Sequence, residues 1–345
     1  MRRRILGGTG ISVSEFALGA MMFGSWGNTD AEEGVRTIRL ALDAGINLVD
    51  TADIYGSGGS ERIVGRAIRG RRDDVVLATK FHSPMGPDAN QQGNSRRWIV
   101  KALEGSLRRL GTDHVDLYQV HRIDPDTDID ETLSALSDLV RAGKIRAIGT
   151  SNFPADQLVE AQWAAERRGH VRFRSEQPQY SVLARAVETH VLPTAQRHGV
   201  GVLPWGPLGA GWLTGREIRP GVGRAVLEQR KFDLSVPENA VKAQAVTELR
   251  KVAADAGLSL THLALAFVNA HPAVTSVLLG PRTPAQLTDL LGAAGVDLDD
   301  EVLDRIDAIV PPGVDLNRAD HHWVPRVLTD ASLRRRPLAR GRGTA

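Results

Sequence analysis

The sequence of 345 residues predicts an α/β fold in which eight parallel strands, each followed by a helix, close into a (β/α)8 TIM barrel. Short runs rich in Val, Ile and Leu recur along the chain, and amphipathic segments with helical periodicity separate them. About 250 residues suffice for such a barrel, which leaves roughly 95 for additions. No Pro/Ser-rich linker divides the chain, so we expect one barrel domain over residues 1–310.

Before the first strand, Gly7–Gly10 lie between two short apolar stretches, Ile5-Leu6 and Ile11–Val13. A glycine-rich turn between such stretches suits a tight β-hairpin. We expect this N-terminal hairpin to close one end of the barrel.

The apolar runs predict the eight strands of the barrel at residues 16–19, 46–50, 75–80, 115–121, 147–152, 171–177, 200–205 and 274–280. The segments between them carry apolar residues at helical spacing, for example Val35, Ile38 and Leu42. Side chains at this spacing share one face of a helix, which can pack against the barrel.

Three segments are expected outside the regular barrel. The longest irregular stretch, 209–237, follows the seventh strand, and we expect an active-site loop there. After the eighth strand, Pro284–Leu291 and Asp299–Ile309 predict extra C-terminal helices. Residues 311–345 form a basic C-terminal extension, expected to be disordered from about residue 334.

Composition and charge exclude several classes of protein. The net charge is only +2, and five arginines within 334–345 more than account for it, so no nucleic-acid-binding surface is expected. The absence of cysteine excludes disulfides, thiolate metal sites and a cysteine nucleophile, and we expect no metal centre. Neither a run of eighteen apolar residues nor a secretory signal is present, so we expect a cytoplasmic protein that does not enter a membrane.

Polar side chains end five of the expected strands, at the edge where barrels carry their catalytic groups. They are Asp50, Lys80, His121, Ser151-Asn152 and Gln177. For any one of them, a role as a helix cap or loop start is the simpler explanation. Five together favour a catalytic site.

Tyr55 follows Asp50 by five residues, and we expect the barrel to bring Lys80 near both. A charged Lys80 would favour tyrosinate and lower the pKa of Tyr55, while Asp50 would hold the ammonium in place. Tyr55 could then act as a general acid, with His121 orienting the substrate oxygen. A tyrosine acid without a nucleophile or metal cluster suggests that a carbonyl oxygen is protonated while a nicotinamide supplies hydride.

With these residues the chain resembles the aldo-keto reductase family, and more narrowly the branch that contains the potassium-channel β subunits. The resemblance covers about residues 3–310 and rests on several motifs in order, which together are specific. The segments are Leu18–Gly24, Asn47–Gly56, Ala78–Lys80, Val120–Arg122, Gly149–Phe153, Glu176–Tyr180, Trp205–Gly209 and Val277–Leu287.

The resemblance implies that Tyr55 is the proton donor, that Lys80 and Asp50 tune it, and that His121 orients the substrate. It also implies NADP(H) as the cofactor. NADPH is favoured over NADH because Arg282 is placed to pair with a 2′-phosphate. The cofactor-binding residues that it implies are Gly19, Ala20, Met21, Asp50, Ser151, Asn152, Gln177, Trp205, Gly206, Pro207, Leu208, Gly209, Gly211, Leu213, Arg216, Gly280, Arg282, Gln286 and Asp289.

Within that set, Ser151, Asn152 and Gln177 would hold the nicotinamide carboxamide, and Trp205 would stack on the ring. The substrate is expected beside Trp26, His82 and Arg122, together with Tyr55 and His121. Aromatic and histidine side chains suit a small carbonyl compound that is partly apolar or sugar-like. Assembly into a homo-oligomer stays open.

Two other interpretations stay open. A Schiff-base lyase would use Lys80 as its nucleophile, although Asp50 beside it would stabilise the unreactive ammonium form. A nucleotide-sensing regulatory subunit, as in the channel β subunits, would bind the cofactor without depending on turnover. No partner motif in the sequence supports the second interpretation.

Overall fold

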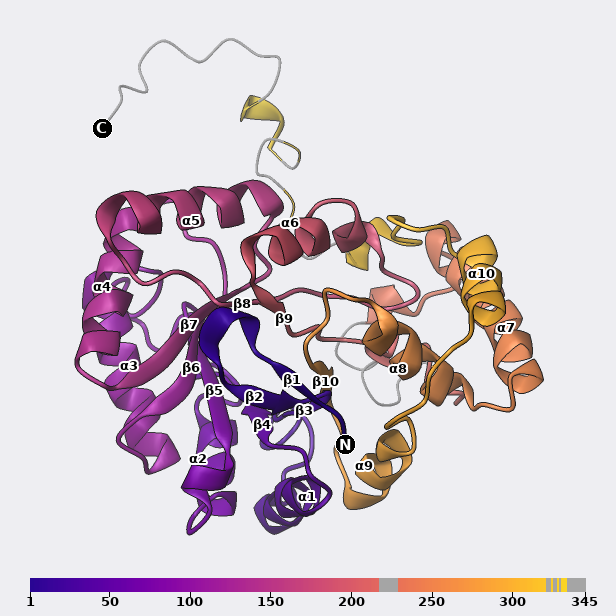
Figure 1. Cartoon of the computed structure of the whole chain (residues 1–345), viewed down its shortest axis with the longest axis horizontal. Helices are drawn as coiled ribbons and strands as arrows, with labels where there is room; N and C mark the ends of the chain where they lie inside the picture. The colour runs from indigo at the N-terminus through magenta and orange to yellow at the C-terminus, as the bar shows by residue number, and fades with distance from the viewer. Residues whose placement is uncertain (217–228, 321–323, 325–327, 329, 334–345) are drawn as a thin grey trace.

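The computed structural model describes residues 1–216, 229–320, 324, 328 and 330–333, and within them it contains an eight-stranded parallel sheet (Figure 1). The strands are β3 (Phe16–Gly19), β4 (Leu48–Asp50), β5 (Val76–Phe81), β6 (Val115–Val120), β7 (Ile145–Ser151), β8 (Ser175–Gln177), β9 (Gly201–Val202) and β10 (Val277–Leu279), in the order β10-β3-β4-β5-β6-β7-β8-β9. The two edges of the sheet meet, because Thr275 N donates to Val202 O at 2.8 Å and Leu278 N to Pro204 O at 2.9 Å. The predicted (β/α)8 barrel is confirmed.

Helices surround the curled sheet in Figure 1. They are α1 (Ala31–Asp43), α2 (Gly59–Ala67), α3 (Arg96–Leu110), α4 (Ile129–Arg141), α5 (Ala155–Arg168), α6 (Val191–His198), α7 (Pro237–Asp255), α8 (Leu260–Ala270), α9 (Pro284–Leu291) and α10 (Asp300–Ile309). Short 3-10 helices lie at Gly7–Thr9, Arg72–Asp74, Ala186–Glu188, Gly209–Gly211, Gln229–Lys231, Arg318–Asp320 and Ala331–Leu333. Side-chain caps begin several of the helices; Asp30, for instance, accepts from the first turn of α1.

The N-terminal hairpin is also present. Strands β1 (Arg3–Ile5) and β2 (Ser12–Ser14) pair antiparallel. The side chains of Leu6 and Val13 are fully buried and pack in the cluster that fills the barrel interior. The hairpin therefore closes the end of the barrel opposite to the carboxyl ends of the strands.

Strand alternation decides what the barrel encloses, because successive side chains point to opposite faces. The interior cluster includes Ala17, Leu48, Ala78, Leu117 and Ala147. Two residues further along β4, β5 and β6, the same alternation places Asp50, Lys80 and Gln119 inside, each at most 2% exposed. A polar layer thus lies above an apolar floor.

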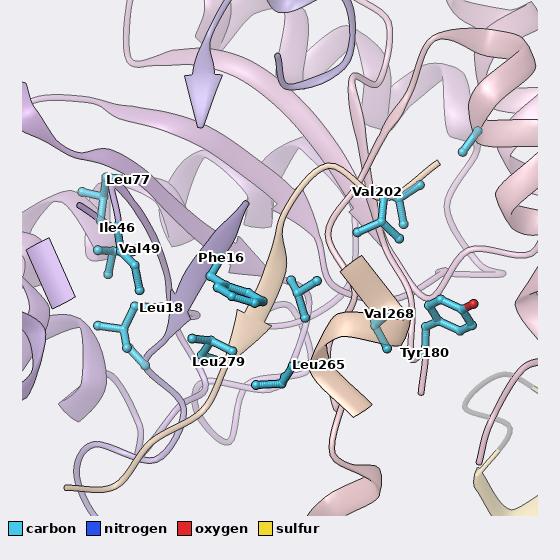
Figure 2. Close-up of a cluster of buried hydrophobic side chains, with 14 of the residues drawn as sticks. Phe16, Leu18, Ile46, Val49, Leu77, Tyr180, Val202, Leu265, Val268 and Leu279 are labelled. Atoms are coloured by element: carbon cyan, nitrogen blue, oxygen red, sulfur yellow. The ribbon is translucent and has the colours of Figure 1, made fainter. Parts of the chain in front are cut away.

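The opposite faces of the strands pack against the helices and form the larger core. Figure 2 shows part of it, with Phe16 and Leu18 of β3 and Leu279 of β10 in one cluster with Leu265 and Val268 of α8. This core holds the strand ends at fixed positions around the barrel mouth.

Several strands are shorter than expected. In the run 200–205 the continuous ladder is limited to Gly201–Val202. Leu203 N and Trp205 N still donate to Glu176 O and Pro178 O, both at 2.9 Å, but Pro178, directly after the neighbouring strand, has no N–H to return. The run 171–177 pairs only from Ser175, since Val171 N is taken by Ser137 Oγ at 2.9 Å and Phe173 O by Gln162 Nε2 at 2.9 Å. Outside the barrel, α9 and α10 confirm the predicted C-terminal helices.

Part of the expected active-site loop and the expected disordered tail lie outside the described residues. Within the described residues, no single helix is both long and apolar enough to span a membrane; α7 and α8 meet both conditions only when they are taken together, across a bend of 90°.

The described start of the C-terminal extension packs on α7 through buried polar contacts. Asn317 Nδ2 donates to Asn239 Oδ1 at 2.8 Å, and the ammonium of Lys242 pairs with the carboxylate of Asp320. Both members of the ion pair are buried. A buried charge is costly without its partner, so this pair constrains where residues 317–320 lie.

Replacing Lys242 alone should destabilise the fold. Lys242→Met leaves the Asp320 carboxylate buried without its ammonium, and we expect a loss of about 3–5 kcal/mol in the free energy of unfolding, measured by urea denaturation. The double variant Lys242→Met, Asp320→Leu should recover most of that loss. The exposed ion pair of Lys251 and Glu248 on the same helix is the control. Lys251→Met, which removes that pair, should lower the free energy of unfolding by less than about 1 kcal/mol.

Candidate active site

The ammonium of Lys80 is the centre of the candidate site. It is fully buried, and its three N–H groups donate to Asp50 Oδ2 at 2.5 Å, Thr51 O at 2.9 Å and Tyr55 Oη at 3.3 Å. Because an ammonium has three donors and no acceptor, its hydrogen-bonding capacity is used fully. The Tyr55 oxygen accepts from Lys80, which leaves the Tyr55 hydroxyl proton to be donated elsewhere.

The Asp50 carboxylate is held from across the barrel. Its Oδ1 accepts from Gln119 Nε2 at 2.9 Å and from Gln177 Nε2 at 3.0 Å, and the two glutamines contact each other at 3.3 Å. Residues from β4, β5, β6 and β8 therefore meet at one ion pair. This network fixes the Lys80 ammonium relative to Tyr55.

Aromatic rings surround Tyr55, which follows β4 and is 9% exposed. Its ring centroid lies 5.8 Å from that of His121, edge to face, and 5.8 Å from that of Trp26. Trp26 is itself exposed. The structure thus brings Asp50, Tyr55, Lys80, His121 and Trp26 together.

The electrostatics differ from the expectation in one respect. Burial raises the pKa of Tyr55 above its ordinary value, and the charge of Lys80, which acts in the opposite direction, does not cancel that effect. The expected lowered pKa of Tyr55 is therefore wrong. Burial also opposes the charge on Lys80, but Asp50 and then Tyr55 outweigh it, so the pKa of Lys80 is raised. At neutral pH, Tyr55 is a phenol and Lys80 is an ammonium.

A second group of polar residues lies at the ends of β7 and β8. Asn152, in the left-handed region at φ 61°, donates from Nδ2 to Ser151 Oγ at 2.8 Å and accepts from the indole of Trp205 at 3.1 Å. Ser151 Oγ in turn donates to Gln177 O at 2.9 Å. No described residue donates to Gln177 Oε1, so this oxygen is available to an amide N–H of a ligand. That arrangement fits a nicotinamide carboxamide.

The chain after β9 has a backbone that suits a phosphate. Gly206, Gly209, Ala210 and Gly211 all have positive φ, from 56° to 119°. Runs of such residues form concave sets of N–H groups that bind anions. A Cβ at Gly211 would meet no atom within 4 Å, so the backbone there faces open space.

The other expected cofactor residues lie around β3 and β10. Gly19 pairs with Asp50, Ala20 N donates to Asp50 O at 2.8 Å, and Met21 follows in the same loop. Near β10, Gln286 Oε1 accepts from Arg282 N at 2.8 Å, and Asn28 Nδ2 donates to Arg282 O at 2.9 Å. Arg282 is half-buried there. Pro207, Leu213 and Leu208 lie in the segment that contains Gly206–Gly211, whereas Arg216, Gly280 and Asp289 are exposed.

Two residues that hold the candidate site together escaped the sequence analysis. Gln119 lies inside an apolar run, and its polar character at an interior strand position was the available signal. Glu176 precedes Gln177 and is fully buried; its carboxyl group accepts from Thr150 Oγ1 and from Phe153 N. Glu176 therefore anchors the turn that contains Asn152. Burial raises the pKa of Glu176 to about 8, against the hydrogen bonds that lower it.

Comparison with known proteins identifies relatives over nearly the whole chain. Residues 15–311 match the model of the Aldo/keto reductase family. An uncharacterized oxidoreductase of Bacillus subtilis is 40% identical over 91% of this chain and 97% of its own. An aldo-keto reductase of the same organism is 38% identical over 88% and 91%. A probable voltage-gated potassium channel subunit beta of Oryza sativa is 36% identical over 90% and 97%.

The raised pKa of Glu176 predicts a pH-dependent stability. Glu176 ionises near pH 4.5 in the unfolded chain but only near pH 8 in the fold, so the folded state holds one more proton between these values. The free energy of unfolding should therefore fall as the pH rises from about 5 to 8. Glu176→Gln, which keeps the shape and polarity, should reduce that slope by up to about 1.4 kcal/mol per pH unit in urea titrations.

The exposed residue Glu248 supplies the control, since Glu248→Gln should leave the slope as in the wild type. An unchanged slope in the Glu176→Gln protein would show that Glu176 is ionised in the fold.

Proposed function

Because the chain belongs to the aldo/keto reductase family and is an oxidoreductase, we propose that it reduces an aldehyde or ketone to an alcohol, with NADPH as the hydride source and Tyr55 as the proton donor. The observation that carries the proposal is the buried Lys80 ammonium, bonded at once to Asp50 and to the Tyr55 oxygen. A buried ammonium in contact with a tyrosine oxygen stabilises the tyrosinate that forms when the tyrosine releases its proton.

Ser151, Asn152, Gln177 and Trp205 would hold the nicotinamide end of the cofactor, and the segment Gly206–Gly211 would hold the pyrophosphate. Arg282 would pair with the 2′-phosphate. When bound, NADPH supplies the hydride that becomes the new C–H bond of the alcohol.

The residues of the chain supply the proton and the field. Tyr55 donates its hydroxyl proton to the carbonyl oxygen as that oxygen gains negative charge. Lys80 stabilises the tyrosinate that remains, and its hydrogen bond to the Tyr55 oxygen shortens as that charge develops. His121, edge to face with Tyr55, would donate a hydrogen bond to the same oxygen. Solvent then returns the proton to Tyr55.

A binding role without turnover is the second candidate, since two of the relatives are described as probable voltage-gated potassium channel β subunits. The reductase function requires the Tyr55 hydroxyl for turnover, whereas a binding role does not require it. The Schiff-base interpretation is disfavoured, because the raised pKa of Lys80 keeps its amine protonated. We propose a cytoplasmic enzyme whose partner is a small carbonyl compound.

Removing the Tyr55 hydroxyl should abolish most of the turnover. Tyr55→Phe should lower the rate of NADPH oxidation with an aldehyde by about 10² to 10⁴, the usual scale of general acid catalysis, while NADPH binding followed by fluorescence stays nearly intact. Tyr118→Phe is the matched control, because Tyr118 is also buried but its hydroxyl contacts only Ile99 O, at 3.4 Å, among the described residues. Wild-type turnover in the Tyr55 variant would remove Tyr55 from the proposed role.

The proposed contact of Arg282 with the 2′-phosphate is tested by comparing the binding of NADPH and NADH. A charge-assisted contact to the 2′-phosphate implies that Arg282→Ala weakens NADPH binding by about 10- to 150-fold and leaves NADH binding nearly unchanged. Arg305→Ala, at the exposed pair with Asp255, controls for loss of a surface charge. Equal losses for both cofactors would show that the 2′-phosphate contact lies elsewhere.

A further inference from the structure

His82 lies beside the proposed reaction centre and is held in a strained conformation. It follows β5 by one residue and Lys80 by two. Phe81 pairs with Val120, and His121 N donates to Phe81 O at 3.0 Å, so the two histidines leave neighbouring strands at the same edge. The backbone of His82 has φ 136°, in the region that favours glycine. Strain of this kind in a non-glycine residue is characteristic of functional sites.

The side chain of Asn94 is fixed next to His82. Asn94 is 4% exposed, and one end of its amide lies 3.0 Å from the carbonyl oxygen of Arg122. A carbonyl oxygen only accepts, so that end of the amide must be the NH₂ group. Its backbone is anchored too, because Asn94 N donates to Asp124 Oδ2 at 2.8 Å and Asn94 O accepts from Thr132 Oγ1 at 3.0 Å.

The orientation of Asn94 decides the tautomer of His82. The other end of the amide, Oδ1, faces His82 Nδ1 at 3.0 Å. An amide oxygen can only accept, so His82 Nδ1 carries the proton and donates it. In a neutral imidazole, the second nitrogen is then an acceptor.

His82 is neutral at neutral pH. Burial lowers its pKa, and the charge of Arg122 acts in the same direction, against the hydrogen bond to Asn94 and the charge of Asp124. No residue in the part of the chain that the structure describes donates to His82 Nε2. The charge of Arg122 also interacts with Tyr55, which places this group of residues near the proton donor.

From this geometry we infer that His82 Nε2 accepts a hydrogen bond from a hydroxyl group of the substrate, and that the protein therefore prefers carbonyl compounds that carry a hydroxyl close to the carbonyl. The inference rests on the proposed function, since it names the substrate class of that site. Hydroxyaldehydes and hydroxyketones present such a donor; their deoxy analogues do not. A buried acceptor left without a donor discriminates against those analogues.

Lactaldehyde and propanal form a matched pair, because they differ only in one hydroxyl. With NADPH, the wild-type kcat/KM should be larger for lactaldehyde than for propanal, and His82→Phe should reduce the ratio of the two values by about 3- to 10-fold. The hydroxyl also makes the carbonyl more electrophilic, but this intrinsic effect persists in the variant and cancels in the comparison.

His114→Phe is the matched control. His114 immediately precedes β6, at the end of the barrel remote from His121, and its ring bonds Asp113. The substrate ratio should stay at the wild-type value in this variant. A ratio that is unchanged in His82→Phe would overturn the inference while leaving the reductase function standing. If none of the carbonyl compounds tested supports oxidation of NADPH, the proposed function itself would instead be overturned.

The tautomer can be tested without activity. Long-range ¹H–¹⁵N NMR of the wild-type protein at neutral pH distinguishes a protonated from an unprotonated ring nitrogen, and the signals of His82 are assigned by their loss in His82→Phe. We expect a protonated Nδ1 and an unprotonated Nε2. A protonated Nε2, in either the neutral ring or the imidazolium, would overturn the inference whatever the kinetics show.

Discussion

The buried ion pair of Lys80 and Asp50 is the interaction on which the arrangement of the site depends. An ammonium removed from water must find a partner for each of its protons, and its carboxylate partner must be satisfied as well. Here the ammonium takes Asp50, the Thr51 carbonyl and Tyr55, while Gln119 and Gln177 satisfy the other carboxylate oxygen. Four strands and the turn that carries Tyr55 are therefore tied to one charge.

Among these partners only Tyr55 can give up a proton near a ligand. The positive charge of Lys80 therefore favours one reaction, the release of the Tyr55 hydroxyl proton. Asp53, whose backbone N–H donates to Lys80 O, adds little negative charge that would weaken the field of Lys80 at neutral pH. Burial, and then repulsion by Glu61, raises the pKa of the Asp53 carboxyl to about 8, so it is mostly protonated. The charges near the Tyr55 oxygen are then chiefly those of Lys80 and Asp50, and the positive one is in contact with it. This explains how a tyrosine whose pKa is raised by burial can still release its proton when an acceptor develops charge.

Much of the barrel could be predicted from sequence, because apolar runs mark strands and the residues that end those runs lie at one edge. Asp50 and Lys80 were found in that way. The lengths of the ladders could not be predicted, since they depend on which N–H groups find partners; Val171 N, for example, donates to Ser137 Oγ instead of to a neighbouring strand. Gln119 was hidden because its run also contains Asp116 and His121, and nothing in its spacing marks it out from them. The sign of the shift in the Tyr55 pKa was missed because burial, which dominates it, is not visible in the sequence.

The second buried lysine extends the same principle to the rim of the barrel. The chain contains only six lysines, and Lys242, like Lys80, is among those withdrawn from water. Its ammonium pairs with Asp320 and lies 5.4 Å from the ring centroid of Trp212, which stacks on Phe232 at 5.7 Å. Trp212 directly follows the glycine-rich segment that suits a phosphate. The cation–π attraction between an ammonium and an indole ring is stronger when the ammonium is withdrawn from water. The start of the C-terminal extension therefore helps to fix the backbone of that segment, although the two are separated by about a hundred residues in the sequence.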